Sequence, residues 1–236
     1  MRDEHYSARY CLNRTVNFVF FTNLFVCFVM LILLLQHMDE AMYLMRKRIQ
    51  KFPTLFPQEV VLLDDLWSQL VDAWYKAAVS EKKSFKNWKC PEEGRAWFGA
   101  KFLYALFNVM SKHWMAMAID IKHGHIHLYD CDHACCTTEQ SKPFVEPFQF
   151  LVPKIIQQCK LFTEEECPNM ANTSWPVIHI KEIVPQMYTS RDCGICYLKF
   201  IEMHMMKVPF MRLNDLYVEM LRKKLVAEFF ARNMDL

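Results

Sequence analysis

The sequence has little glycine and almost no net charge, and each shortage excludes a class of protein. Only 4 of its 236 residues are glycine, which excludes a collagen-like chain. The 28 Lys and Arg residues nearly balance the 26 Asp and Glu residues, and a net charge of +2 argues against nucleic acid as a partner. Hydrophobic residues make up 53% of the chain, so general disorder is excluded, and the length suits one domain with an appendage.

The cysteines do not follow the spacing of a disulfide framework. Ten of them are spread through the chain, at positions 11, 27, 90, 131, 135, 136, 159, 167, 193 and 196. Disulfide frameworks are typical of short secreted chains, whereas a chain of 236 residues can bury a core without cross-links. We therefore expect mostly reduced thiols, as in a cytosolic or nuclear protein.

One long hydrophobic run, Val16–Leu35, contains no charged residue over twenty positions. A helix of this length rises about 30 Å, which matches the hydrocarbon core of a bilayer. Basic residues follow the run at positions 46, 47, 48 and 51, and this excess favours a cytosolic location for the C-terminal side. The run predicts a transmembrane helix that anchors the protein to a membrane, with a buried core helix as the alternative.

The chain divides near residue 52. Residues 1–52 are interpreted as an N-terminal segment with the hydrophobic helix and a basic linker, and residues 53–236 as the folded domain. Within that domain, residues 59–78 place apolar side chains at three- and four-residue steps, which predicts an amphipathic helix. Residues 80–93 are polar and predict a loop.

Two short segments predict a β-hairpin that brings a histidine beside an aspartate. Residues 113–119 are nearly all apolar, residues 125–130 alternate, and residues 120–124 between them have turn chemistry. If 119 faces 124, then His113 lies directly opposite Asp130, within hydrogen-bond reach. A carboxylate beside an imidazole orients a general base and stabilises its charged form. A polar pair at the end of a sheet is the alternative.

Cys193 is predicted to lie in the first turn of a helix. Asp192 or a neighbour can cap the apolar stretch 195–206, and the free amide groups of a first turn favour a thiolate. Gly194 has no side chain to hinder a substrate that approaches the sulfur. Cys193 is therefore a candidate nucleophile. An inert core thiol is the alternative, and it is the state that we expect for Cys196.

Taken together, these motifs resemble those of the ubiquitin-like-protein-specific cysteine proteases, the SUMO protease group. Three motifs stand in that family's order and spacing: His113-Trp114, Asp130 seventeen positions after His113, and Asp192-Cys193-Gly194. The tail at residues 217–227 resembles the plant, transposon-associated branch of the family. The similarity runs from about residue 102 to the C-terminus.

The resemblance implies an α+β fold of the papain-like, adenain-like cysteine protease type, with a central sheet flanked by helices. It implies Cys193 as nucleophile, His113 as general base and acid, and Asp130 as the orienting partner of His113, with no metal or organic cofactor. Trp114 matches the tryptophan that clamps the Gly-Gly tail of a ubiquitin-like modifier. The implied protein is a monomeric peptidase, nuclear or cytosolic, that processes a SUMO-type modifier or removes it from its conjugates.

The sequence departs from the family at the oxyanion position. The family has a glutamine six positions before the cysteine, where this chain has Met187, and Gln186 stands seven positions before it. A thioether cannot donate a hydrogen bond, which leaves Gln186 as the oxyanion candidate. Two other functions therefore stay open: a catalytically weakened or silent domain that binds a ubiquitin-like protein, and a membrane-tethered interaction protein.

A cluster of histidines and cysteines follows the predicted turn. Its members are His123, His125, His127, Cys131, His133, Cys135 and Cys136. Zinc is held by four ligands of these kinds, but no C-x2-C pair is matched by a second pair at the spacing of a zinc finger. We therefore expect polar loop residues here and no metal.

Overall fold

The computed structural model describes residues 38–80, 97–110, 112–187 and 193–234, and residues 39–236 belong to one compact unit. The predicted transmembrane segment Val16–Leu35 lies outside the described residues. Among the helices that are described, none is both long and apolar enough to cross a bilayer. The membrane anchor therefore stays a prediction.

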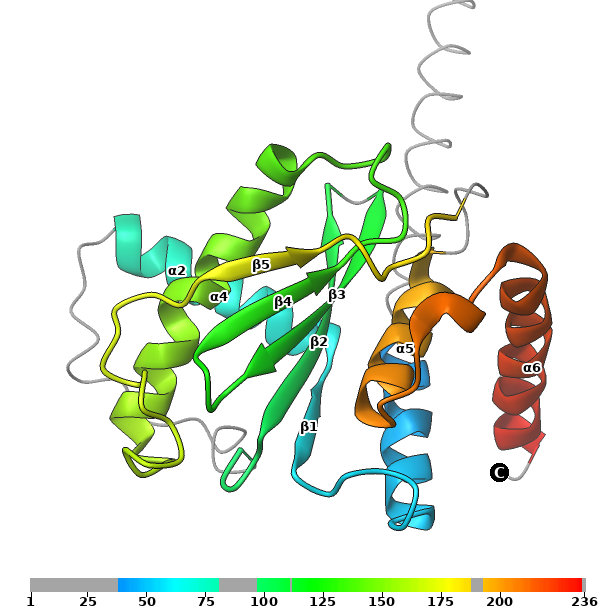
Figure 1. Cartoon of the computed structure of the whole chain (residues 1–236), viewed down its shortest axis with the longest axis horizontal. Helices are drawn as coiled ribbons and strands as arrows, with labels where there is room; N and C mark the ends of the chain where they lie inside the picture. The colour runs from blue at the N-terminus through cyan, green and yellow to red at the C-terminus, as the bar shows by residue number, and fades with distance from the viewer. Residues whose placement is uncertain (1–37, 81–96, 111, 188–192, 235–236) are drawn as a thin grey trace, which may run out of the picture. The chain divides into compact units, whose positions relative to one another are not determined.

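A five-stranded mixed sheet forms the centre of the fold (Figure 1), with the strand order β1-β2-β3-β4-β5. The strands are β1 (Val60–Leu63), β2 (Phe102–Val109), β3 (His113–Asp120), β4 (His125–Tyr129) and β5 (Val177–Ile180). The three central strands are antiparallel to one another, and the two outer strands run parallel to their neighbours. The predicted α+β class with a central sheet is confirmed.

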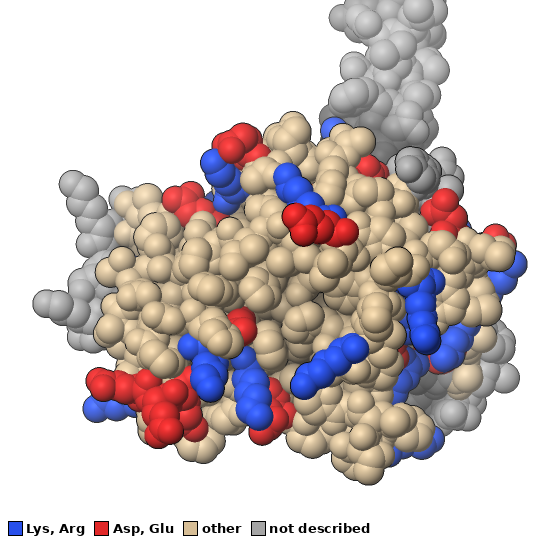
Figure 2. Space-filling view, viewed as in Figure 1, with Lys and Arg blue, Asp and Glu red and all other residues tan. Residues whose placement is uncertain are grey.

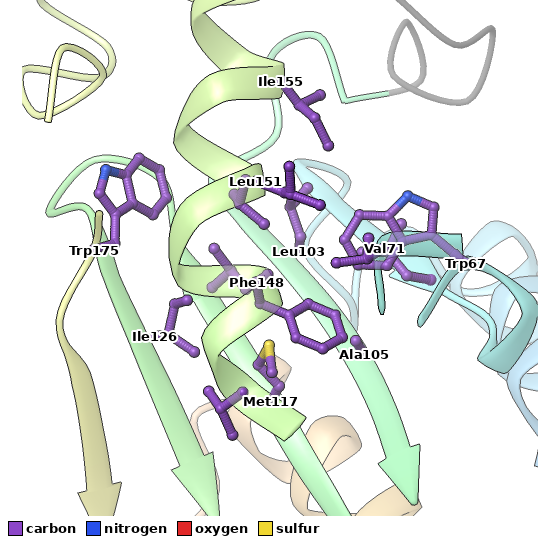
Figure 3. Close-up of a cluster of buried hydrophobic side chains, with 14 of the residues drawn as sticks. Trp67, Val71, Leu103, Ala105, Met117, Ile126, Phe148, Leu151, Ile155 and Trp175 are labelled. Atoms are coloured by element: carbon purple, nitrogen blue, oxygen red, sulfur yellow. The ribbon is translucent and has the colours of Figure 1, made fainter. Parts of the chain in front are cut away.

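Helices cover both faces of this sheet (Figure 1). They are α2 (Asp65–Ser80), α4 (Thr138–Cys159), α5 (Cys193–Met205) and α6 (Asp215–Met234), with the short 3-10 helix η2 (Phe210–Arg212) before α6. The main core lies between the sheet and the pair α2 and α4, where Phe148 of α4 contacts Trp67 of α2 and Phe107 of β2 (Figure 3). Helix α5 packs against β3 from the other face, and α6 packs along α5.

The amphipathic helix predicted at residues 59–78 is a strand followed by a helix. Four consecutive apolar residues, Val60–Leu63, pair with β2, because an unbroken apolar run can be buried on both faces of a sheet. The helix begins only after Asp64, whose carboxylate accepts a hydrogen bond from the backbone N–H of Trp67 at 3.0 Å. The predicted helix is therefore present, but the prediction starts it six residues too early.

Helix α4 is absent from the sequence prediction because prolines interrupt its pattern. Thr137 begins the helix with a capping box. Its side chain accepts a hydrogen bond from the backbone N–H of Gln140, and the Gln140 side chain accepts one from the backbone N–H of Thr137. Pro153 inside the helix has no N–H to donate to the carbonyl of Gln149, and Trp175 donates its own backbone N–H there at 3.0 Å. A segment distant in sequence thus supplies the hydrogen bond that the proline removes.

The stretch interpreted as a basic linker is helical between residues 39 and 51. Its apolar side chains Ala41, Met42, Met45 and Ile49 are buried, because they recur on one face of the helix. The charge of Arg48 is paired rather than solvated: its guanidinium bonds Glu228 of α6 at 2.9 Å and Glu202 of α5 at 3.3 Å. This segment therefore belongs to the folded unit.

The β3–β4 hairpin forms where it was predicted, but its register differs by two residues. Ala116 faces Tyr129 and Asp120 faces His125, so Asp130 lies diagonally across from His113 instead of directly opposite. The connecting turn ends at Gly124, whose φ of 63° favours glycine. A slip of two residues keeps every side chain on its face, whereas a slip of one would have separated the pair.

Candidate active site

His113 and Asp130 form a buried pair at one end of the sheet. His113 is the first residue of β3, and Asp130 follows the last residue of β4. The His113 Nε2 atom lies 2.8 Å from Asp130 Oδ1, and the two residues are only 1% and 6% exposed. Because the carboxylate occupies Nε2, Nδ1 is the ring nitrogen left to exchange a proton with another group.

Cys193 reaches this pair from the other side. It is the first residue of α5, it is half-buried, and the packing of α5 against β3 brings its thiol close enough to His113 to help raise the pKa of the imidazole. The structure therefore brings together the three side chains that the sequence singled out.

The charges of His113 and Asp130 shift each other's pKa in the direction opposite to the effect of burial. Burial alone would lower the pKa of His113, but its hydrogen bonds to Asp130 and Cys193 and the negative charge of both raise it to about 10. Burial alone would raise the pKa of Asp130, but the hydrogen bonds from His113 and from the backbone of Asp132 lower it. The raised pKa of His113 and the lowered pKa of Asp130 favour a protonated imidazole beside an ionised carboxylate.

Tyr197 completes the site, and the sequence analysis missed it. It lies one turn after Cys193 on α5 and is fully buried. Its hydroxyl oxygen is 3.1 Å from His113 Nε2 and 3.4 Å from Asp130 Oδ1. Its ring meets the imidazole edge-on, with 5.9 Å between the centroids. The spacing of four residues from Cys193 was the available signal, because such residues share a helix face.

Two further cysteines lie beside this tyrosine. The backbone N–H of Cys131 donates to the Tyr197 hydroxyl at 3.4 Å, and Cys131 Sγ lies 3.3 Å from the same oxygen. Cys196 is fully buried, and a hydrogen bond to Cys131 together with burial raises the pKa of its thiol. These surroundings favour the neutral thiol that was expected of Cys196. Among the described cysteines, Cys159 differs from the expectation of reduced thiols because it is disulfide-bonded.

The amide of Gln186 holds the loop that follows β4. Its Nε2 donates to the carbonyl oxygen of Asp130 at 3.0 Å, and its Oε1 accepts from the backbone N–H of His133 at 3.0 Å. Next to it, the backbone N–H of Met187 donates to the carbonyl of Cys131 at 2.8 Å, and the Met187 side chain is buried. Both ends of the Gln186 amide are thus engaged by the loop that carries Asp130.

Trp114 follows His113 on β3, so its side chain points to the opposite face of the sheet. It is 5% exposed and faces Asn108 of β2. The part predicted for it in holding a substrate tail is untested by this geometry, and it stays a prediction.

The histidines of the expected loop cluster have partners other than a metal. His123 Nδ1 lies 2.8 Å from Asp120 Oδ2, and the rings of His123 and His125 stack with 6.3 Å between their centroids. Within the described ranges, no group of three or more His, Cys, Asp or Glu side chains is placed to hold a metal ion.

The molecular surface in Figure 2 carries basic and acidic side chains interspersed, with no large patch of one sign on that face.

Comparison with known proteins identifies the group to which this site belongs. The family profile described as "Ulp1 protease family, C-terminal catalytic domain" matches residues 31–234. The Ulp1 protease domain solved in complex with Smt3, the yeast ortholog of SUMO, is 15% identical and aligns over 79% of this chain and 73% of its own, with a TM-score of 0.51. The Chaetomium thermophilum Ulp1-like SUMO protease catalytic domain is 14% identical over 81% of this chain and 69% of its own, with a TM-score of 0.52. No curated protein gives a significant match.

Proposed function

Because the chain belongs to the Ulp1 protease family, we propose that it is a cysteine peptidase that cleaves after the Gly-Gly tail of a SUMO-type modifier. The observation that carries the proposal is the buried, hydrogen-bonded pair of His113 and Asp130, with Cys193 beside it at the start of α5. The modifier as partner is supported by the solved Ulp1 domain, which is described in complex with the yeast ortholog of SUMO.

The geometry supports acyl transfer through a thioester. His113 takes the thiol proton of Cys193 through Nδ1, and the sulfur attacks the carbonyl carbon of the second glycine. When the tetrahedral intermediate collapses, the C–N bond breaks and His113 gives the proton to the leaving amine. His113 then takes a proton from water, whose oxygen attacks the thioester and releases the free carboxylate and Cys193. The reaction needs no cofactor.

Other parts of the proposal rest on the family resemblance. They are Trp114 as the clamp on the Gly-Gly tail, a monomeric state, a nuclear or cytosolic location, and similarity to the plant branch. The predicted membrane anchor rests instead on the uncharged run Val16–Leu35. None of them is needed for the chemistry at Cys193.

An electrophilic probe tests the proposed function. A SUMO-type modifier with a thiol-reactive group in place of its C-terminal carboxylate should form a covalent adduct at Cys193, which peptide mass spectrometry locates. The exposed Cys135 is the internal control, because a non-selective electrophile would label it as well. Binding of the modifier without an adduct at Cys193 would favour the silent binding domain over the peptidase.

We expect Met187→Gln to raise turnover. The tetrahedral intermediate carries negative charge on oxygen, and a preorganised donor is typically worth about 2.7–4 kcal/mol. The Gln186 amide already bonds the loop that carries Asp130 at both of its ends. This engagement supports an oxyanion site that lacks a glutamine donor. The expected gain in kcat is on the order of tenfold, less than the full value of a donor because the Met187 side chain is buried and an amide in its place has to be desolvated.

Met187→Leu is the matched control, since it keeps the size of the side chain and adds no donor. Equal kcat in the glutamine variant and the wild-type chain, measured on a modifier-tail substrate, would show that the donor is already supplied elsewhere. Gln186→Ala is not a suitable control, because it would release the loop that carries Asp130.

A further inference from the structure

The hydroxyl of Tyr197 is surrounded by groups from two segments that are distant from it in sequence. Tyr197 belongs to α5, and the groups around its oxygen are His113 of β3, Asp130 at the end of β4, and Cys131 in the next loop. A buried hydroxyl is unfavourable unless hydrogen bonds replace those that it loses to water. Phenylalanine would fill the same space, so the hydroxyl itself requires an explanation.

The hydrogen-bond inventory assigns one direction to each contact. A hydroxyl has one hydrogen to donate and can accept two. The backbone N–H of Cys131 donates to its oxygen, and the Cys131 thiol, 3.3 Å away, is a weaker donor that competes with His113 for the second lone pair. The hydroxyl hydrogen is available for Asp130 Oδ1, 3.4 Å away. That carboxylate oxygen also accepts from His113 Nε2 at 2.8 Å and from the N–H of Asp132 at 2.9 Å. The carboxylate is thereby held by donors from three segments.

This arrangement also determines which ring nitrogen of His113 carries the hydrogen. With its own hydrogen directed at Asp130, the Tyr197 oxygen presents lone pairs to His113 Nε2 at 3.1 Å. An N–H at Nε2 can donate to two acceptors, Asp130 Oδ1 and the Tyr197 oxygen. A deprotonated Nε2 would instead place its own lone pair against the lone pairs of these two oxygens. The lone pair of the neutral ring is then on Nδ1, the nitrogen left for Cys193.

We propose that Tyr197 is a positioning residue, whose hydroxyl fixes the His113–Asp130 pair in the tautomer and orientation that activate Cys193. Because Tyr197 and Cys193 share one face of α5, the same helix carries the nucleophile and holds its base in place. This inference rests on the proposed peptidase function and adds a specific contribution to it.

Tyr197→Phe is the test, and Tyr104→Phe is its matched control. Tyr104 is equally buried and its hydroxyl also bonds a histidine, His204 Nδ1 at 2.6 Å, but it has no contact with the three catalytic candidates. The first measurement is the rate at which iodoacetamide alkylates Cys193, followed peptide by peptide with Cys135 as the internal reference. The second is the separate determination of kcat and KM on a modifier-tail substrate.

We expect Tyr197→Phe to slow the alkylation of Cys193 and to lower kcat, each roughly two- to tenfold, which is the value of one net hydrogen bond, with KM unchanged. Tyr104→Phe should change neither rate. Unchanged rates in Tyr197→Phe, equal losses in the two variants, or a Tyr197→Phe chain that does not fold would overturn the positioning role. Wild-type Cys193 that reacts no faster than Cys135 would instead contradict the proposed function itself.

Discussion

Cys193→Ser is expected to abolish cleavage of a modifier-tail substrate, with a loss of kcat/KM of at least about 10³-fold. A serine hydroxyl has a far higher pKa than a thiol, so the same imidazole cannot ionise it to a useful extent. The melting temperature should stay close to that of the wild-type chain, because the side chain is only half-buried and the substitution is nearly isosteric.

Cys196→Ser serves as the control, because Cys196 lies on the same helix but is fully buried beside Cys131. It should lose stability without losing the chemistry of Cys193. If Cys193→Ser retains full activity while folded, the nucleophile is a different residue.

Asp130→Asn is expected to lower kcat/KM by about 10²–10⁴-fold, the usual contribution of an oriented general base. The carboxylate helps to raise the pKa of His113 to about 10, so the neutral amide should lower that pKa. Activity that depends on the imidazolium is lost as pH rises through the pKa of His113. The alkaline limb of the pH–rate profile, near pH 10 in the wild-type chain, should therefore move to lower pH in the variant.

The stability of the fold offers a second measurement of the same pairing. The folded pKa of His113 is raised, so its pairing stabilises the fold fully below the unfolded pKa of about 6.5. That contribution is lost as pH rises toward about 10, and Asp130→Asn should reduce this pH dependence of the free energy of unfolding.

Asp120→Asn is the matched control, because Asp120 also bonds a histidine, His123, but at the other end of β3. A pH–rate profile that shifts equally in the two variants would mean that the effect does not come from the Asp130 pairing.

The sequence predicted those parts of the site that depend on local patterns. Cys193 at the start of a helix, and His113 and Asp130 on the two strands of a hairpin, follow from motifs a few residues long. The register was wrong by two residues, because the turn residues 120–124 permit more than one way to close the hairpin. The pairing survived because the error was an even number of residues.

The features that the sequence did not predict depend on distant partners. Helix α4 tolerates Pro153 because Trp175 donates to the carbonyl of Gln149. The helix at residues 39–51 buries one apolar face, and its Arg48 is paired with carboxylates of α5 and α6, which lie more than 150 positions away. Tyr197 is separated from His113 by 84 positions, and its four-residue spacing from Cys193 indicates a shared helix face but not the contact of its hydroxyl with the imidazole.

The two hydrogen bonds of the Gln186 amide have a consequence for how this protein can vary among its relatives. The amide nitrogen donates to the carbonyl of Asp130, and the amide oxygen accepts from the N–H of His133. Residue 186 and the loop at residues 130–133 are therefore structurally dependent on each other. A substitution at 186 leaves two backbone groups without their partner unless the loop changes length or shape as well. We therefore expect these two segments to covary in an alignment of relatives, with insertions in the loop occurring mainly in sequences that lack the glutamine.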